Sequence, residues 1–413
     1  MSLETHIAGS EDRLIDGLHF ASRNSASYIT ARRATTFSPS SASSWKPSGV
    51  RLARFNLADH AGWLDGGTVR LLMTITNTHA SSPLVPIAVS PACMFRRVRI
   101  IANGSAVLED IEDYGRVFQL FSELLPPQCR FTNLSETWGS VESSPTLGTP
   151  ESFDNIVALA SRTVCVDLLS SFLSQGKLSP LTMLPITIEI ELGDQNDAFS
   201  SDVAWEITRP RLVGDVCDLD QALANSYAKH LLDGKSLPMY MHGMYSIKSS
   251  IPTGSYFSLP IARGFTRLST VYVTFWDSTG KWVNRFHHPN ATSANATAED
   301  DLEWNLTIGS DRWPSFNCDS SQESMYRLRL ATASHMRSDL STITPYQYRN
   351  NKFIIGQSLE KAPGQSSHTG INTRSGSQLT LNFNNLGTAT MCHVLLHYEQ
   401  IANLSAAGVK VLD

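Results

Sequence analysis

A Gly-Lys-Ser triplet near the middle of the chain is the first place where the residue types suggest chemistry, because such a triplet ends a phosphate-binding loop. The triplet is Gly234-Lys235-Ser236. The full motif, G-x-x-x-x-G-K-S, needs its first glycine at the position that Lys229 occupies. The triplet also follows an expected helix, whereas the motif follows a strand. We therefore interpret Gly234 as a helix end and Lys235 as a solvated side chain.

Two histidines, His393 and His397, have the spacing of a metal-binding pair on a helix. Their surroundings, Cys392-His-Val-Leu-Leu-His-Tyr398, are typical of a strand. Positions four apart on a strand are separated by about 13 Å, at roughly 3.3 Å per residue, which is too far to share one ion. The cysteines form no C-x-x-C pair, so we expect reduced, mostly buried thiols and no zinc site or disulfide framework. The six cysteines are Cys93, Cys129, Cys165, Cys217, Cys318 and Cys392.

Two short acidic clusters could supply the paired carboxylates of a glycosidase, which face each other across roughly 5 to 10 Å. The clusters are residues 109–113 (Glu-Asp-Ile-Glu-Asp) and 299–303 (Glu-Asp-Asp-Leu-Glu). A helix N-terminus favours acidic residues, which explains the first cluster, and the second is typical of a solvated loop. The G-x-S-x-G and H-E-x-x-H motifs are absent from the sequence. We therefore predict a protein that is not an enzyme, with no catalytic, cofactor-binding or metal-binding residues and no cofactor.

The composition indicates a globular chain that buries much of its surface against partners. At 413 residues the chain is longer than one hydrophobic core normally supports, so two domains are expected. Charged residues make up 17% of the chain, below the roughly 25% of an average soluble domain. The net charge of −5 argues against a protein that coats nucleic acid by neutralising phosphates.

Residues 1–48 are rich in Ser, Thr and Ala and have no sustained apolar period, which predicts an N-terminal arm. Basic and acidic side chains nearly balance in it, so it is not a basic tail that grips nucleic acid. The N-terminus lacks the layout of a secretion signal, and no stretch approaches the roughly 18 apolar residues of a membrane span. We therefore expect a protein that is made and used inside a cell, not secreted through a signal peptide.

Beyond the arm, apolar residues recur with period two, which is the pattern of strands with one buried face. The clearest examples are residues 69–75, 186–192, 271–275 and 379–383. Asn103-Gly104 separates two apolar runs and suits the positive φ angles of a tight hairpin turn. Many strands with turns between them and little helix predict a β sandwich or jelly roll.

Three helices are expected as insertions between strands. The first carries an apolar stripe from Ile111 to Leu125, with Asp110 available as its cap. The second, about residues 219–232, has Leu219, Leu223, Tyr227 and Leu231 on one face, and near mid-chain it would connect the domains. The third, about residues 322–335, is weaker.

The two halves of the chain also echo each other, which suggests duplicated domains. Residues 95–98 (Phe-Arg-Arg-Val) match residues 265–268 (Phe-Thr-Arg-Leu), and residues 186–193 match residues 379–387. The growing offset between the matches points to an insertion in the second half, at about residues 279–320. Seven of the eight tryptophans stand mostly at expected strand ends or in loops, where they could either anchor subunit contacts or pack in the core. They are Trp63, Trp138, Trp205, Trp276, Trp282, Trp304 and Trp313.

The order of these segments resembles that of double jelly-roll major capsid proteins, which form the shells of Polinton-like viruses, adintoviruses, virophages and larger double-stranded DNA viruses. The resemblance covers nearly everything from about residue 48 onward. It rests on residues 95–105, 108–111, 114–116, 184–192, 205–207, 351–361, 375–381, 397–401 and 408–413. It implies an all-β fold of two tandem antiparallel eight-stranded jelly rolls with a few short inserted helices.

This resemblance, with the boundaries above, divides the chain into an arm (1–48), a first jelly roll (49–215), a connecting helix and linker (216–236) and a second jelly roll (237–413). It implies a major capsid protein that forms homotrimers, and pseudo-hexagonal capsomers that tile an icosahedral shell around double-stranded DNA. The partners would be the chain itself and penton or other minor capsid proteins, without sequence-specific nucleic-acid binding. The protein would be located in the capsid shell of the virion. A carbohydrate-binding or carbohydrate-cleaving tandem β sandwich remains the alternative.

Overall fold

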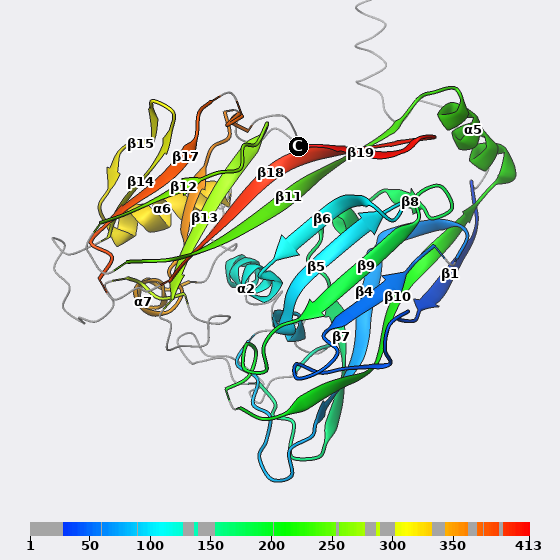
Figure 1. Cartoon of the computed structure of the whole chain (residues 1–413), viewed down its shortest axis with the longest axis horizontal. Coiled ribbons are helices and arrows are strands. Elements are labelled where there is room, and N and C mark those ends of the chain that lie inside the picture. The colour runs from blue at the N-terminus through cyan, green and yellow to red at the C-terminus, as the bar shows by residue number, and fades with distance from the viewer. Residues whose placement is uncertain are drawn as a thin grey trace, which may run out of the picture.

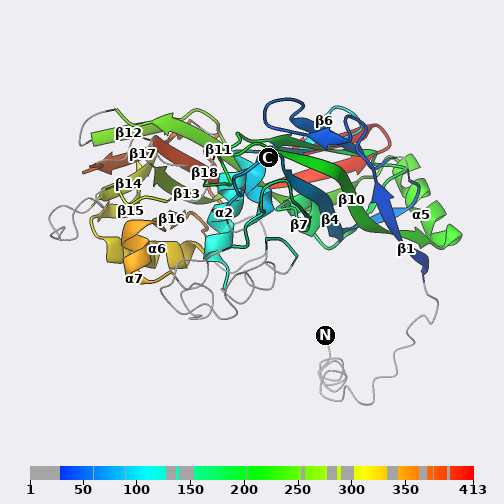
Figure 2. The same ribbon diagram turned by 90° about the horizontal axis from the view of Figure 1, so that it is seen from below.

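The computed structural model describes most of the chain and consists mainly of antiparallel strands (Figure 1). The described residues are 28–58, 60–88, 90–126, 136–138, 153–200, 202–252, 256–276, 286–289, 302–332, 343–361, 370–374, 376–387 and 391–413. They form two β domains that lie side by side, with one helix between them (Figures 1 and 2). Within the described residues, no helix is long and apolar enough to cross a membrane.

The first domain is a sandwich of two sheets. One sheet has the order β1-β10-β4-β7, formed by β1 (Ile29–Phe37), β10 (Trp205–Leu219), β4 (Trp63–Asn77) and β7 (Ser161–Asp167). The short strands β2 (Ser44–Trp45) and β8 (Leu178–Pro180) pair with β10 and β4. The other sheet has the order β3-β9-β5-β6, formed by β3 (Leu52–Asn56), β9 (Ile186–Leu192), β5 (Phe95–Ala102) and β6 (Ala106–Glu112).

The second domain repeats this arrangement. One sheet has the order β11-β18-β13-β16, formed by β11 (Leu237–Ser250), β18 (Met391–Ser405), β13 (Leu268–Trp276) and β16 (Ile355–Ser358). A C-terminal strand, β19 (Gly408–Leu412), folds back onto β18. The other sheet has the order β12-β17-β14-β15, formed by β12 (Tyr256–Ile261), β17 (Leu379–Asn384), β14 (Glu303–Ile308) and β15 (Asp311–Cys318).

The strand order is the same in both domains. When the eight principal strands of each are numbered along the chain, one sheet reads 1-8-3-6 and the other reads 2-7-4-5 in both cases. This is the double Greek key of a jelly roll, so the prediction of two eight-stranded rolls is confirmed. The match of residues 186–193 with 379–387 is also confirmed, because β9 and β17 are both seventh strands. The match of residues 95–98 with 265–268 is wrong, because Phe95 begins a fourth strand and Leu268 begins a third.

Alternating burial produces the core that the period-two pattern predicted. In β4 the side chains of Val69, Leu71, Met73 and Ile75 are buried, and the residues between them are partly exposed. The turn between β5 and β6 has positive φ at both Asn103 and Gly104, as expected for a tight hairpin. Strand β13 differs from expectation, since it is buried on both faces.

The helices lie between strands, as expected. They are the 3₁₀ turn η2 (Pro91–Met94) and the helices α2 (Tyr114–Leu124), α4 (Ser171–Ser174), α5 (Gln221–Leu232), α6 (Ser321–Ala331) and α7 (Pro345–Asn350). Helices α2, α5 and α6 correspond to the three predicted ones, and α5 connects the rolls. The proposed cap of α2 is wrong. Asp110 lies within β6 and pairs with Arg97 at 2.7 Å, because the strand continues to Glu112.

Two boundaries differ from the sequence expectation. The predicted arm, residues 1–48, contains β1, which pairs with β10 along its length and is therefore the first strand of the first roll. Its side chains are mostly exposed, so it carries no apolar alternation, and backbone pairing holds it in place. The predicted insertion, residues 279–320, contains β14 and β15, the fourth and fifth strands of the second roll. Residues 277–285 and 290–301 lie outside the described residues.

Candidate functional site

The residues whose types first suggested chemistry have structural roles in the fold. Gly234 follows α5 with a φ of +80°, and Lys235 is exposed, which agrees with a helix end and a solvated lysine. His393 and His397 lie on β18, as predicted for a strand. Burial lowers the pKa of His397 to about 3, and its ring stacks on that of His242 with centroids 4.7 Å apart. Among the described side chains, no three His, Cys, Asp or Glu residues are grouped to hold a metal ion.

The acidic clusters do not form a shared cleft among the residues that the structure describes. Glu109 is buried in the first roll and accepts hydrogen bonds at the start of α4, from Ser170 Oγ at 2.5 Å and from Ser171 N at 2.9 Å. Burial raises its pKa, and these hydrogen bonds oppose the shift. Glu303, the described end of the second cluster, lies on β14 in the second roll. Glu109 is thus a structural group that holds α4. The helix explanation for the cluster holds only for Asp113, the residue directly before α2, because the other acidic residues lie in β6.

The described cysteines are free thiols, in agreement with the expectation. Cys93, Cys217, Cys318 and Cys392 are buried and Cys165 is partly exposed. Cys129 lies outside the described residues.

The two rolls meet at a junction where α2 of the first roll packs against β13 of the second (Figure 1). Arg116 on α2 is 0% exposed. Its guanidinium donates to Thr274 Oγ1 from Nε at 3.2 Å and from Nη2 at 3.1 Å, and Nη2 also donates to the Phe275 carbonyl at 3.3 Å. The guanidinium also lies 4.3 Å from the ring centroid of Trp276. Arg116 therefore joins the first roll to three successive residues of the second.

A buried chain of polar groups lies beside Arg116. Asp113, just before α2, forms an ion pair with Lys248 of β11. Ser246 Oγ, also on β11, lies 3.4 Å from Asp113 Oδ2 and 2.7 Å from His393 Nε2. Burial, with smaller effects of the cations Arg116 and Lys248, holds the pKa of His393 well below its ordinary value. The junction therefore contains a neutral histidine between two cations.

The charges at the junction are compensated across it. Burial lowers the pKa of Arg116 to about 9, and the carboxylate of Asp113 opposes that shift. Arg116 is therefore charged at neutral pH. At the other end of α2, Glu123 forms an ion pair with Lys352 of the second roll at 2.6 Å. Both carboxylates belong to the first roll and their lysine partners to the second, so both ion pairs are lost when the rolls separate.

A second line of contact runs from the junction along β6, β11 and β19 (Figure 1). Gln400 Nε2 on β18 donates to the Leu108 carbonyl on β6 at 2.7 Å. The backbone N–H of His242 on β11 donates to Ser171 Oγ of the first roll at 2.8 Å. Together with the contacts of α2, these hydrogen bonds link the two rolls at several points.

The tryptophans are mainly core residues, which decides between the two interpretations given above. Trp138, Trp205, Trp276 and Trp304 are buried, and Trp63 and Trp313 are partly exposed. Trp282 lies outside the described residues. The exposed large side chains are instead mostly tyrosines and aliphatic residues. They include Tyr240, Tyr256, Phe316, Tyr326, Tyr346, Val157, Leu159 and Leu232.

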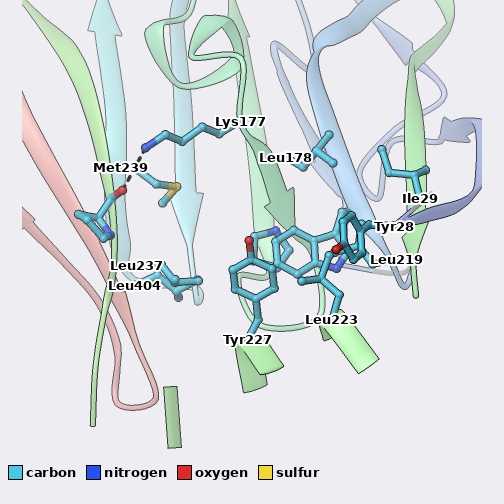
Figure 3. Close-up of a pocket in the computed structure, with 13 residues that line it drawn as sticks. Tyr28, Ile29, Lys177, Leu178, Leu219, Leu223, Tyr227, Leu237, Met239 and Leu404 are labelled. Atoms are coloured by element: carbon cyan, nitrogen blue, oxygen red, sulfur yellow. Dashed lines mark hydrogen bonds between the residues drawn. The ribbon is translucent and has the colours of Figure 1, made fainter. Parts of the chain in front are cut away.

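An apolar pocket also lies beside α5, between the ends of the two rolls (Figure 3).

Solved structures with the same arrangement come from viruses. VP54 of PBCV-1, fitted into a cryo-EM reconstruction of the virophage Sputnik, matches with a TM-score of 0.62 and 10% identity, over 95% of this chain and 99% of that one. The Faustovirus major capsid protein matches with a TM-score of 0.62 and 9% identity, over 95% and 93% of the two chains. The chain has a double jelly-roll fold. A chain of the Sputnik virophage structure matches with a TM-score of 0.56 and 9% identity, over 96% and 92%.

The likeness is one of fold and not of sequence. No family model matches the chain, and no curated protein matches it. At identities near 10%, what the chains share is the double jelly-roll fold. The fold that the sequence resemblance implied is therefore confirmed.

Proposed function

We propose that this protein is the major capsid protein of a double-stranded DNA virus and acts by self-assembly. Three copies would form a homotrimer with a pseudo-hexagonal outline, and these capsomers would tile an icosahedral shell. The observation that carries the proposal is the pair of rolls with one strand order, fused side by side by a buried junction. Threefold symmetry then gives a ring of six similar rolls. The capsid proteins among the structural neighbours support this reading.

The proposed role needs no reaction at the protein, and the neighbours named above are structural. The partners would be other copies of this chain, with penton and other minor capsid proteins at special positions of the shell. The site of action would be the virion. A net charge of −5 fits a shell that encloses DNA without coating it by neutralising its phosphates.

Helix α6 is the surface that would join one copy to the next. Both α2 and α6 lie between the fifth and sixth strands of their rolls, so they occupy equivalent places. Helix α2 is almost wholly buried because it packs against the neighbouring roll within the chain. Helix α6 keeps Tyr326 53% exposed, beside β15 with Phe316 54% exposed. In a ring of six rolls, α6 would face the first roll of the next copy, as α2 faces the second roll of its own.

Light scattering of the purified chain after size-exclusion chromatography tests the proposal. We expect a mass of three chains for the wild type, and a shift toward one chain for Tyr326→Asp. The control is Tyr256→Asp, which places the same charge at another exposed tyrosine, on β12. A wild-type monomer that binds glycans saturably would overturn the capsid proposal in favour of carbohydrate binding. Intact trimers of Tyr326→Asp would contradict only the assignment of α6.

A further inference from the structure

The pocket beside α5 has the size and lining of a site that holds an apolar ligand. Its volume is about 450 Å³, within the roughly 300–1,000 Å³ of pockets that enclose a ligand. Figure 3 shows Leu237 and Leu404 of the second roll on one side and Tyr28 and Leu219 of the first roll on the other. The pocket therefore spans the two rolls at the point where the chain crosses between them.

Helix α5 forms another wall of this pocket and is otherwise weakly held. Leu223 and Tyr227 line the pocket and are only half-buried, and the ring of Tyr227 lies 5.2 Å from that of Trp63. Leu231 is the one residue of α5 that is fully buried. The apolar face of this helix thus faces an open pocket, an arrangement that leaves apolar surface in contact with water.

We propose that the chain's own N-terminal segment, residues 12–21, occupies this pocket. The described chain begins at Tyr28, which is itself part of the pocket wall. The preceding residues contain an apolar cluster of Leu14, Ile15, Leu18 and Phe20 in an otherwise polar stretch. Phe20 precedes Tyr28 by eight residues, so the connecting chain reaches about 26 Å when extended. The cluster can therefore reach every wall of the pocket from the point where it is tethered.

The tether and the local charges favour the same molecule as the source of the segment. A short flexible tether gives an effective concentration in the millimolar range, which favours capture within one chain. Asp16 lies inside the apolar cluster, and the exposed side chain of Lys177 lines the pocket. Asp16 can thus pair with Lys177 while Leu14 and Leu18 face the pocket. The bound segment then braces α5 against both rolls. This inference does not depend on the capsid role.

Hydrogen exchange of the full chain tests whether residues 12–21 occupy the pocket. In the wild type, amides of residues 12–21 should exchange at least tenfold more slowly than those of an unstructured peptide. Leu223→Asp, which places a charge in the pocket wall, should abolish this protection. The matched control Asn225→Asp adds the same charge on the opposite, exposed face of α5 and should leave protection intact. Absence of protection in the wild type, or protection that survives Leu223→Asp, would overturn the proposal.

Disulfide crosslinking tests which molecule supplies the segment. A chain with Leu18→Cys and Leu223→Cys is prepared in light and heavy isotopic forms, mixed before oxidation and analysed by mass spectrometry. We expect linked peptides that are entirely light or entirely heavy, and no link when Asn225→Cys replaces Leu223→Cys. Mixed light–heavy peptides would show exchange between copies and would overturn the intramolecular assignment. The test gives the same answer whether the chain is a monomer or a trimer.

Discussion

Replacing Arg116 by alanine should destabilise the protein more than replacing Arg327, an arginine on the equivalent helix of the second roll. Arg116 is fully buried and makes at least three hydrogen bonds to Thr274 and Phe275 across the junction. The substitution leaves those oxygens without a charged donor and opens a cavity beside Trp276. It also removes one of the cations that compensate Asp113. Breaking a buried charged network of this kind costs about 3–5 kcal/mol.

The assay is the free energy of unfolding from urea titration, followed by circular dichroism. Arg327→Ala on α6 is the control, because it removes an arginine with a partner on its own helix, Glu323 at 3.0 Å. Such a pair within a helix contributes about 0.3–0.5 kcal/mol. Hydrogen exchange should in addition become faster in β13 of the Arg116 variant, where the junction is lost. A loss of stability for Arg116→Ala no larger than that of Arg327→Ala would refute the idea that the junction couples the rolls.

Two further predictions concern the same region. His393 is neutral in the folded protein, because its pKa there is held well below the ordinary value of 6.5. In the unfolded chain it takes up a proton near pH 6.5. The folded state is therefore unaffected by this histidine above pH 6.5 and loses stability as the pH falls below that value. His393 should contribute up to about 1.4 kcal/mol per pH unit to the loss of stability between pH 6.5 and 5, beside that of His397, whose pKa is also lowered. Urea titrations should therefore show a smaller loss in His393→Asn than in the wild type, and equal slopes would exclude this histidine as a cause. Gly115→Ala should destabilise the fold by roughly 1–3 kcal/mol, because a methyl group there overlaps the Cys93 carbonyl of η2. Thermal melting should show this loss, and it should show almost none for Gly67→Ala, where the added methyl group meets only Asp65 Oδ1, at an ordinary contact distance of 3.7 Å.

The strands could be predicted because their signal is local. Alternation in β9 places Ile186, Ile188 and Ile190 in the core, and neighbouring positions of one strand are enough to reveal it. Strand β1 lacked that signal because it lies at a sheet edge with most side chains in water. Its Arg32 pairs with Asp65 and Asp215, so its attachment is made by backbone pairing and ion pairs. Burial patterns cannot find a strand that buries so little.

The junction could not be predicted from the sequence, since its partners are far apart along the chain. Arg116 and Thr274 are separated by 158 residues, and nothing near Arg116 indicates that this arginine is buried. The alternating pattern of residues 271–275 predicted a strand with one face exposed to water. In the structure this strand, β13, is buried on both faces. The helix that covers the second face comes from the other roll.

The two equivalent helices, α2 and α6, differ in the kind of contact they suit: α2 joins the two rolls of one chain, and α6 would join one copy to the next. Contacts inside one chain form once, during folding, so α2 can use buried charges such as Arg116 and Glu123 that always find their partners. Contacts between copies form later, from surfaces that are first in water. A surface such as that of Tyr326 and Phe316 suits this step, because exposed aromatic rings are tolerated in water and gain most when they are buried. In the proposed ring of six rolls, charged contacts within chains would therefore alternate with aromatic contacts between them, and the ring would close only when the third copy is added.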